Sequence, residues 1–392
     1  MNILLISGTF PPRRYGGVTR ISYITAKKLQ GKGHKVTVYT TDLGNTPHSR
    51  LNIQNTVVLD GVTVYYFKNI SNILAFKHHI FLPLGMIQIM RRSIKCYDVV
   101  HINGFRELHN VAVSYYATKN HVPYVLQAHG SLPRVMNKRR LKWIYDVLFG
   151  YRLLKNASRV IALNRSEAEQ YRAIGVPEEK IAIIPNGIDL SEYVNLPPEG
   201  AFRRAFNIPE NMKIILYLGR VHKTKGIDLL IRAYAHLRNK MRCKDVFLVI
   251  AGPDDGYLGE AKALANSLGL CGSIIFTGFI SNEDKLKALV DAEVFVTPSF
   301  YGFPMTFLEA CAVGVPIVTT NLGETLEWIN ENVGYITQPT PQNLAEAIHR
   351  IVSDDRLRRK FSENCTKIVK SEFSIEKVVE KLEKLYEEVV EK

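Results

Sequence analysis

Short apolar segments alternate with helical segments along nearly the whole chain, and one long irregular stretch interrupts the alternation. The segment "NILLISG" at residues 2–8 is followed by a helical pattern over 18–33 and then by "KVTVYTT" at 35–41. After the irregular stretch, the alternation begins again with "KIILYLGR" at 213–220 and "DVFLVIAG" at 245–252. Strands that alternate with helices form mostly parallel sheets covered on both faces. The sequence therefore predicts an α/β protein with two doubly wound domains in tandem.

The irregular stretch, "IPNGIDLSEYVNLPPEG" at residues 184–200, is rich in Pro, Gly and Asn and is typical of a linker. A chain of 392 residues also exceeds the size at which one hydrophobic core stops growing. We therefore place an N-terminal domain at 1–190 and a C-terminal domain at 191–372. The charged amphipathic segment 373–392 is expected to be a helix that crosses back to the N-terminal domain. Ligands of such sheets bind beyond the carboxyl ends of the strands, so we expect the two domains to face one cleft.

Several classes of protein are disfavoured by simple patterns. The apolar run "IFLPLGMIQIM" at 80–90 is broken by Pro83 and Gly85, and it is shorter than the roughly 20 residues of a membrane-spanning helix. The N-terminus has no basic region before its apolar run, which indicates a first strand rather than a signal peptide. The five cysteines are scattered without metal-ligand or redox spacing. These patterns predict a cytoplasmic protein.

The positive charge is concentrated in the first half of the chain. Residues 1–190 carry 26 Lys and Arg against 10 Asp and Glu, whereas the whole chain has a net charge of +14. A basic surface is typical of proteins that bind nucleic acid, an anionic membrane or a phosphorylated substrate, and it can equally be a solvated face. No RNA-binding motif or aromatic–basic platform accompanies the charge, so nucleic acid is not expected as a partner. Residues 78–95, apolar and then basic, could rest on an anionic membrane surface.

Two cations in one loop form a candidate phosphate site. A strand that ends at Gly219 is followed by Arg220 and Lys225, and Gly226 precedes an apolar-striped helix. Cations beside a helix N-terminus, at the carboxyl end of a strand, suit a diphosphate. The alternative is that both cations are solvated loop residues. The loop after the first strand, "SGTFPPRRYGGVTR", has no G-x-G-x-x-G pattern, which disfavours a nicotinamide or flavin cofactor.

Beyond this loop the chain resembles the family 4 retaining glycosyltransferases, which have the GT-B architecture of two facing Rossmann-like domains. The resemblance is carried by "GRVHKTKGIDLLIRAY" at 219–234, "IAGPDDGY" at 250–257, "IIFTGFIS" at 274–281 and "EVFVTPSFYGFPMTFLEACAVGVPIVTT" at 293–320. "YGG" at 15–17, "AHGS" at 128–131, "IPNGID" at 184–189 and the final charged helix extend it over nearly the full chain. It is close in the second half and looser in the first.

The resemblance implies a nucleotide-diphosphate sugar as donor, with UDP, GDP or ADP as the nucleotide, held mainly by the C-terminal domain. Arg220 and Lys225 would grip the diphosphate and act in catalysis by stabilising the leaving group. Glu309 matches the second glutamate of the family's paired-glutamate motif and would bind the ribose hydroxyls. A buried charge needs such partners, and the apolar neighbours of Glu309 predict burial. The alternative is a capping box, because "TFLE" at 306–309 fits that pattern.

Other donor contacts are implied in the same way. The loop "GFPMT" at 302–306 would offer the backbone N–H groups of Phe303, Met305 and Thr306. On the N-terminal side, His129 matches the family's donor-contacting histidine and is expected to act on the transferred sugar in catalysis. Gly16 and Gly17 would allow close approach of the backbone to the donor phosphates.

One position departs from the family. Tyr301 stands where the first motif glutamate is common, and a tyrosine offers a hydroxyl but no carboxylate. This leaves two hypotheses. The first is a retaining, metal-independent hexosyl- or N-acetylhexosaminyltransferase without a cofactor, acting on an anionic or lipid-linked glycan acceptor, with a peripheral position at the inner face of the membrane. The second is a nucleotide-sugar-binding module with little or no turnover.

Overall fold

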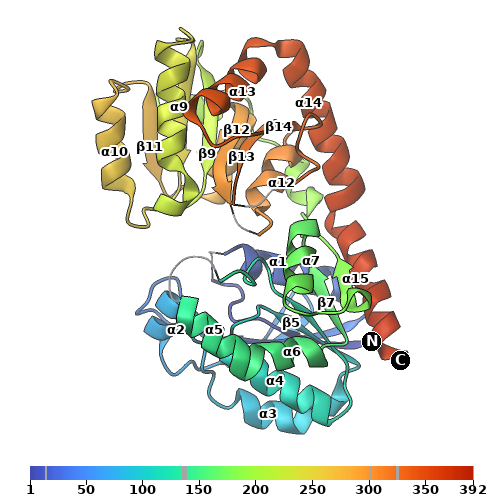
Figure 1. The fold of residues 1–392 in the computed structure, drawn as a ribbon. Coiled ribbons are helices and arrows are strands. Elements are labelled where there is room, and N and C mark those ends of the chain that lie inside the picture. Colours follow the sequence, from blue (N-terminus) through green and yellow to red (C-terminus); the bar gives the residue numbers. More distant parts are fainter. Residues whose placement is uncertain (14–15, 135–138, 301, 324–325, 392) are drawn as a thin grey trace. The chain divides into compact units, whose positions relative to one another are not determined.

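The computed structural model describes residues 1–13, 16–134, 139–300, 302–323 and 326–391. The chain forms two compact units (Figure 1). The first comprises Met1–Gly187 together with Ile375–Lys392, and the second comprises Ile188–Ser374. The chain therefore enters the second unit at Ile188, within the Pro/Gly/Asn-rich stretch, and returns to the first unit at the start of its last helix.

The first unit contains an eight-stranded sheet with the order β3-β4-β2-β1-β5-β6-β7-β8. Neighbouring strands are parallel except β3, which pairs antiparallel with β4. The strands are β1 (Asn2–Ile6), β2 (Lys35–Thr41), β3 (Thr56–Leu59), β4 (Val62–Phe67), β5 (Val99–Asn103), β6 (Tyr124–Gln127), β7 (Arg159–Ala162) and β8 (Ile181–Ile183). The α-helices are α1 (Gly17–Gly31), α2 (Asn72–His78), α3 (Met86–Ser93), α4 (Leu108–Lys119), α5 (Arg139–Tyr145), α6 (Tyr151–Asn156), α7 (Arg165–Ala173) and α15 (Ile375–Val390).

Both faces of this sheet are buried because its central strands are apolar at consecutive positions. In β1, Ile3 and Leu5 pack with α1 and α15 on one face, whereas Leu4 and Ile6 pack against α3, α4 and α6 on the other. This period of two follows from the alternating direction of side chains along a strand. A strand buried on both faces is the pattern of a parallel sheet covered by helices.

The last helix, α15, lies beside α1 in the first unit. Its apolar residues are buried at helical spacing, and its charged face forms ion pairs with the sheet and α1. Lys28 Nζ lies 2.7 Å from Glu376, Arg159 Nη2 lies 2.8 Å from Glu388, and Lys32 pairs with Glu383. Tyr386 reaches through to the sheet, where its hydroxyl lies 2.6 Å from Nδ1 of His101 in β5.

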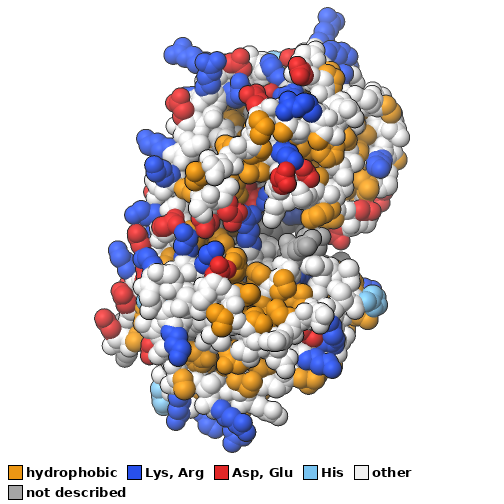
Figure 2. Space-filling view, turned by 180° about the vertical axis from the view of Figure 1, so that it is seen from behind, with side chains coloured by type: hydrophobic (Ala, Val, Ile, Leu, Met, Phe, Trp, Pro, Cys, Tyr) orange, Lys and Arg blue, Asp and Glu red, His pale blue; other side chains and the backbone are white. Residues whose placement is uncertain are grey.

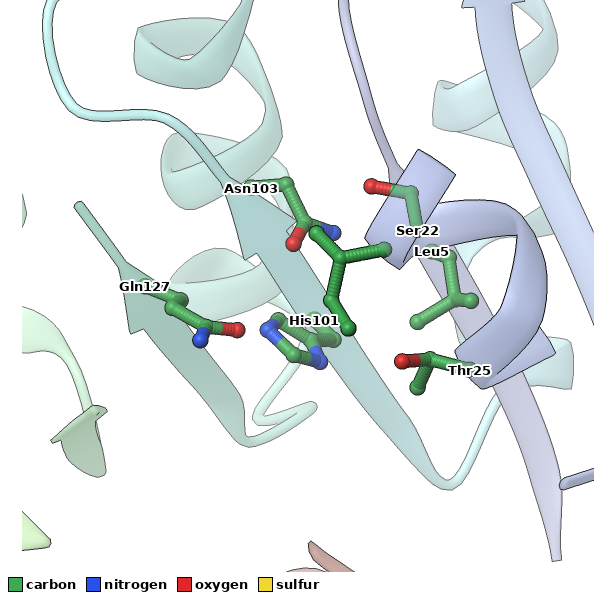
Figure 3. Close-up of a pocket in the computed structure, with 7 residues that line it drawn as sticks. Leu5, Ser22, Thr25, His101, Asn103 and Gln127 are labelled. Carbon is green, nitrogen blue, oxygen red and sulfur yellow. The ribbon is translucent and has the colours of Figure 1, made fainter. Parts of the chain in front are cut away.

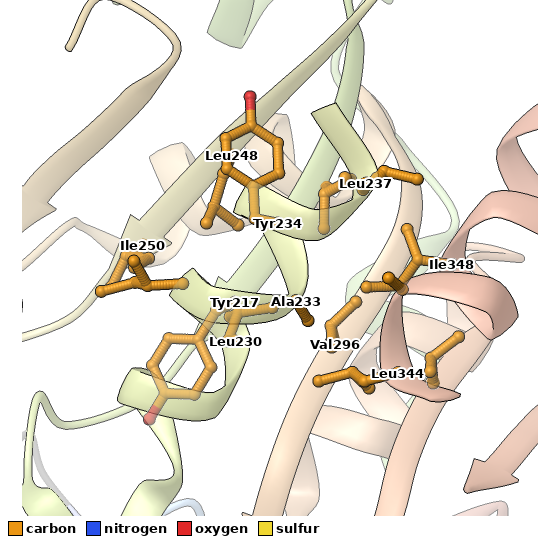
Figure 4. Close-up of a cluster of buried hydrophobic side chains, with 14 of the residues drawn as sticks. Tyr217, Leu230, Ala233, Tyr234, Leu237, Leu248, Ile250, Val296, Leu344 and Ile348 are labelled. Carbon is orange, nitrogen blue, oxygen red and sulfur yellow. The ribbon is translucent and has the colours of Figure 1, made fainter. Parts of the chain in front are cut away.

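The second unit contains a six-stranded parallel sheet with the order β11-β10-β9-β12-β13-β14. The strands are β9 (Lys213–Leu218), β10 (Val246–Ala251), β11 (Ile274–Gly278), β12 (Ala292–Phe300), β13 (Ile317–Gly323) and β14 (Gly334–Thr337). The α-helices are α8 (Ala201–Ala205), α9 (Ile227–Asn239), α10 (Leu258–Ser267), α11 (Asn282–Val290), α12 (Met305–Ala312), α13 (Pro341–Ser353) and α14 (Asp355–Ile368). Side chains of α9 and α13 pack against β9, β10 and β12 in the core of this unit (Figure 4).

On the surface, hydrophobic side chains lie between charged side chains of both signs (Figure 2). Among the residues that the structure describes, no helix has the length and apolar character needed to cross a bilayer.

Candidate functional site

In the second unit, the predicted phosphate-binding cations lie where two neighbouring strands end. Arg220 follows β9, and the short turn η5 (Lys223–Lys225) leads through Gly226 into α9. Gly226 has φ 68°, and a Cβ at this position would lie 2.9 Å from Cβ of Pro298 near the end of β12. Only glycine satisfies both the left-handed backbone and this close approach. The loop after β9 is therefore held against β12, which leads into the helix that carries Glu309.

Lys225 is a partly buried cation with no counter-ion in the described part of the chain. No acceptor among these residues contacts its Nζ. Burial lowers the pKa of Lys225 below its ordinary value, and the neighbouring charge of Arg220 lowers it further. Both causes disfavour the charged form of Lys225. An anion placed beside the two cations would favour the charged form and so raise the pKa again. The loop thus has the electrostatics of an anion site.

Arg220 has a partner of opposite charge within the protein. Its side chain is 63% exposed and forms an ion pair with Asp255, which lies in the loop after β10. Ion pairs between exposed side chains contribute only about 0–1 kcal/mol. A diphosphate can therefore compete with Asp255 for the guanidinium at little cost.

The structure contradicts the capping-box alternative for Glu309. Helix α12 begins at Met305 with Pro304 as its N-cap, and no side chain caps it. Glu309 therefore lies inside the helix, only 3% exposed, rather than at its third position from a Thr306 cap. Its Oε1 lies 2.8 Å from Nζ of Lys285 in α11. The expected burial of this carboxylate is observed, and its charge is balanced by a lysine from a neighbouring helix.

The loop before α12 leads into two of the backbone N–H groups that were expected to contact the donor. Met305 and Thr306 occupy the first two positions of the helix, where N–H groups have no intrahelical acceptor. Phe303 is buried, and its ring stacks on Trp328 with the centroids 6.4 Å apart. This packing fixes the loop that precedes the two donors. Tyr301 lies outside the described residues.

In the first unit, His129 follows β6 in a left-handed conformation with φ 52°. Its Nε2 lies 2.8 Å from Oδ1 of Asn103, the last residue of β5. The amide nitrogen of Asn103 donates to the carbonyl of Ile6, which leaves Oδ1 as the acceptor. His129 therefore carries its proton on Nε2, and burial lowers its pKa to about 3. Its Nδ1 keeps a lone pair and has no hydrogen-bond partner among the described residues.

The loop that carries His129 is held by a buried carboxylate from α7. Glu167 is buried and accepts hydrogen bonds from N–H of Gly130 at 2.6 Å and of Leu163 at 2.7 Å. The hydroxyl of Tyr171, also in α7, accepts a hydrogen bond from N–H of Ala128 at 3.2 Å. The residues on both sides of His129 are thus tied to one helix.

Gly16 and Gly17 lie at the amino end of α1. Gly16 is its N-cap with φ 116°, and no acidic residue occupies the first turn. No side chain among the described residues caps this helix, and N–H groups of a first turn have no intrahelical acceptor.

A polar cavity lies beneath these elements, between α1 and the strands β5 and β6 (Figure 3). Its volume is about 10 Å³, which corresponds to roughly one water molecule. Asn103, His101 and Gln127 face it from the sheet, and Ser22 and Thr25 face it from α1. It is too small for a substrate. His101 is buried against Tyr386, so its role here is to pack the polar interior rather than to contact a ligand.

Stability should fall as the solution becomes acidic. Burial lowers the pKa of His101 and His109 to about 4 and that of His129 to about 3. A histidine with a lowered pKa contributes stability that is complete above its unfolded pKa and is lost as the pH falls below about 6.5. Burial raises the pKa of Glu107 to about 8. The contribution of Glu107 to stability therefore increases as the pH falls, opposite to that of the histidines.

Burial also raises the pKa of Glu293, so three histidines oppose two carboxyl groups. Because the histidines outnumber these carboxyl groups, the free energy of unfolding of the protein should decrease from pH 6.5 to pH 5. Each histidine contributes up to about 1.4 kcal/mol per pH unit. Urea unfolding at several pH values measures this slope, and a His109→Gln variant should show a shallower one. A stability that stays constant or rises toward pH 5 would contradict these pKa directions.

Three residues of these sites were not found from the sequence. Lys285 and Asn103 gave no local signal, because each acts on a residue more than twenty positions away. Glu167 did give one: "NRSE" at 164–167 fits a capping box. Asn164 does cap α7 by accepting from N–H of Glu167, but the Glu167 carboxylate turns to Gly130 and Leu163 instead of the cap.

Comparison with known proteins decides the family. The model of the glycosyl transferases group 1 matches residues 199–368, and the model of Glycosyltransferase Family 4 matches residues 15–192. The two matches follow one another along the chain and fall on the two units. The chain is a family 4-like glycosyltransferase. The expected membership of this family is confirmed.

Relatives and solved structures agree with this assignment. An uncharacterized glycosyltransferase of Methanocaldococcus jannaschii is 28% identical over 100% of this chain and 99% of its own length. The UDP-Gal:alpha-D-GlcNAc-diphosphoundecaprenol alpha-1,3-galactosyltransferase of Escherichia coli is 26% identical over 75% of this chain and 76% of its own. The structure of Anabaena HepE in complex with UDP and glucose superposes with a TM-score of 0.76 at 20% identity, covering 99% of this chain and 100% of that one. The glycosyltransferase has the α/β GT-B fold, as expected.

Replacing Glu167 of this glycosyltransferase by alanine should destabilise the protein and slow its reaction. The change leaves two N–H groups without their acceptor, which costs roughly 1–3 kcal/mol for each. It also releases the loop that orients His129. Urea unfolding and the turnover rate measure the two effects, with the exposed Glu169→Ala in the same helix as control. Equal behaviour of the two variants would show that Glu167 does not hold the loop.

Proposed function

We propose that this protein transfers a sugar from a nucleotide-diphosphate sugar to an acceptor and that the second unit holds the donor. The observation that carries the proposal is the environment of Lys225. This cation is partly buried, lies beside Arg220, and has no counter-ion among the described residues. A desolvated charge without a partner is unfavourable, and it persists where a ligand supplies the opposite charge. The complexes with UDP and glucose among the solved neighbours support a nucleotide-sugar donor.

Each proposed contact has a defined chemical task. Lys225 and Arg220 bind the diphosphate and stabilise the negative charge that develops on it as the glycosidic bond breaks. The N–H groups of Met305 and Thr306 bind oxygen atoms of the phosphate or sugar. Glu309 accepts hydrogen bonds from the ribose hydroxyls, for which it is already buried and ionically paired.

His129 is proposed to act on the transferred sugar. With its proton on Nε2, the imidazole offers the Nδ1 lone pair as an acceptor. A lone pair accepts a hydrogen bond from a sugar hydroxyl, or lies favourably beside the positive charge of an oxocarbenium-like transition state. Gly16 and Gly17 are proposed to bring backbone N–H groups to the donor phosphates.

The finer description of the reaction follows the resemblance to the family. We propose transfer of a hexosyl or N-acetylhexosaminyl group with retention of anomeric configuration and without a metal ion. Proton NMR of the first-formed product tests retention, because the anomeric coupling constant distinguishes the two configurations. Activity in excess chelator tests independence from metal. An inverted product, or loss of activity that added metal restores, would contradict these points.

The acceptor is proposed to be a glycan, anionic or lipid-linked, used on the cytoplasmic side of a membrane. The excess of Lys and Arg in residues 1–190 supports an anionic acceptor. The galactosyltransferase relative is named for a diphosphoundecaprenol-linked acceptor, which supports the lipid-linked form.

The hypothesis of a binding module with little turnover rests on Tyr301 and stays a prediction. Release of free nucleotide during incubation with UDP-, GDP- and ADP-sugars separates it from the enzyme, because many transferases hydrolyse their donor slowly. A donor that stabilises the protein but is never cleaved, with or without glycan acceptors, would favour the binding module.

A further inference from the structure

Apolar side chains of the first unit are exposed along α5 and α6. Helix α5 buries none of its residues. Leu141, Trp143 and Leu148 leave 62%, 53% and 61% of their surface exposed. We call the surface formed by the exposed apolar residues of this stretch the α5–α6 face: Leu141, Trp143, Ile144, Val147, Leu148, Phe149 and Tyr151. An ordinary surface helix turns such residues toward the core, so this face needs an explanation.

The orientation of this stretch is fixed by its polar side. Asp146 is buried, and its carboxylate lies 2.7 Å from Nε of Arg106 and 2.7 Å from Nε of Arg134. The hydroxyl of Tyr145 donates to the carbonyl of Phe105 at 3.2 Å. Since these contacts anchor the helical stretch from within, rotating the apolar residues inward would break an ion-pair network. The outward direction of the apolar residues is therefore built into the fold.

The charged residues of this stretch are positive with one exception. Residues 139–156 contain Arg139, Arg140, Lys142, Arg152 and Lys155, and Asp146 is the one acidic residue among them. Asp146 is neutralised by its two arginines, so it adds no negative charge to the surface. Arg139, Arg140, Arg152 and Lys155 are exposed. Apolar side chains are thus interspersed with exposed positive charges along the stretch.

We propose that the α5–α6 face docks on an anionic lipid bilayer. The helices run one after the other through a π turn at Asp146–Gly150, and together they are long enough to lie in the plane of an interface (Figure 1). Stable peripheral binding requires two signals. Here the first is the insertion of apolar side chains into the headgroup region, and the second is the attraction of cations to anionic headgroups. Tryptophan and tyrosine, both present here, are enriched at this depth of a membrane.

This surface differs from the segment expected from the sequence. In residues 78–95, Leu84, Ile87 and Ile89 are exposed, but Met86 and Met90 are buried as the core side of α3. The α5–α6 face exposes more apolar area and lies on a stretch whose outward orientation is fixed. The inference does not depend on sugar transfer, because membrane binding is measured without donor.

The fluorescence of Trp143 gives a direct test. The chain has two tryptophans, and the other, Trp328, stacks on Phe303 in the second unit. With vesicles of phosphatidylcholine and phosphatidylglycerol, the full-length protein should co-sediment and its emission should shift to the blue. A Trp143→Phe variant should still co-sediment but lose the shift. Vesicles of phosphatidylcholine alone should bind much less protein, and added salt should weaken binding to the anionic ones.

Variants decide which surface is responsible. Leu141→Ser combined with Trp143→Ser and Leu148→Ser should weaken vesicle binding by about ten-fold or more. The matched control replaces Val58, Val194 and Leu196, exposed apolar residues elsewhere, by serine and should bind as the wild type does. If the first variant fails to fold, Arg139→Glu with Arg140→Glu serves as the second test and should also weaken binding.

Three results would overturn the proposal. The first is an absence of binding of the wild type to anionic vesicles. The second is equal binding to vesicles with and without anionic lipid. The third is a wild-type protein that forms a dimer and does not bind vesicles, while the triple serine variant is a monomer. In that case the face would be covered by a second copy of the chain. Stabilisation by nucleotide in the same preparations reports the donor site separately.

Discussion

Replacing Lys225 by alanine should abolish the stabilisation of the protein by its nucleotide diphosphate. A ligand at about 100 times its dissociation constant stabilises the folded state by roughly 2.7 kcal/mol, which a thermal-shift measurement detects readily. Lys225 is the partly buried cation of the loop after β9, and its charge has no counter-ion among the described residues. Removing it takes away the main attraction for the diphosphate. A panel of UDP, GDP and ADP, with their sugars, identifies the nucleotide first.

The unliganded variant separates a binding role from a structural one. A partly desolvated charge without a partner costs stability, so Lys225→Ala without ligand should be at least as stable as the wild type. Lys223→Ala, an exposed lysine in the same turn, is the matched control and should keep the full shift. Arg220→Ala should reduce the shift less completely, because Arg220 is exposed and already paired with Asp255. An undiminished shift in both Lys225→Ala and Arg220→Ala would contradict the assignment of the diphosphate site.

Replacing Glu309 by glutamine should weaken the binding of the nucleoside but not of the diphosphate. Hydrogen bonds to a charged group contribute roughly 1.5–3 kcal/mol, which corresponds to a loss of about 10- to 150-fold in affinity. The substitution keeps the shape of the side chain and removes its charge. Calorimetric titration with the nucleotide and with inorganic pyrophosphate, which lacks the ribose, compares the two contributions within one variant.

Lys285 provides the control for this experiment. It forms an ion pair with Glu309 from α11, so the charge change at 309 also leaves the lysine without that carboxylate. The double variant Glu309→Gln with Lys285→Met removes both charges and should show the same loss of nucleotide affinity with less loss of stability. If the affinities for pyrophosphate and for the nucleotide decreased equally, Glu309 would act through the structure of α12 rather than on the ribose.

The sequence predicts the fold well because the relevant signals are local. The period of two in β1 and the apolar stripe of α9 each involve residues a few positions apart, so strands and helices follow directly. The carboxyl edge of a parallel sheet then places the loops after β9 and β12 side by side, which brings Arg220 and Lys225 near the helix that carries Glu309. The family motifs are the reason why we propose this edge as the donor site.

The remaining features depend on contacts between distant parts of the chain. The lysine that balances Glu309 lies in the preceding helix α11, 24 positions away, and the carboxylate that holds Gly130 lies 37 positions away. The cap of α12 falls on Pro304 rather than Thr306, because the helix begins at Met305. The direction of the apolar residues of α5 is set by Asp146 and its pairing with Arg106, 40 positions away. No local pattern encodes these choices, so they become visible only in the folded chain.

The central claim is that the second unit binds the nucleoside diphosphate through two cations and one acid. A crystal structure of the protein with the nucleotide that gives the largest thermal shift tests it most directly. We expect the diphosphate within hydrogen-bond distance of Lys225 and Arg220 and the ribose hydroxyls on the carboxylate of Glu309. A nucleotide bound elsewhere, with Glu309 still engaged by Lys285 and no ribose beside it, would contradict the account.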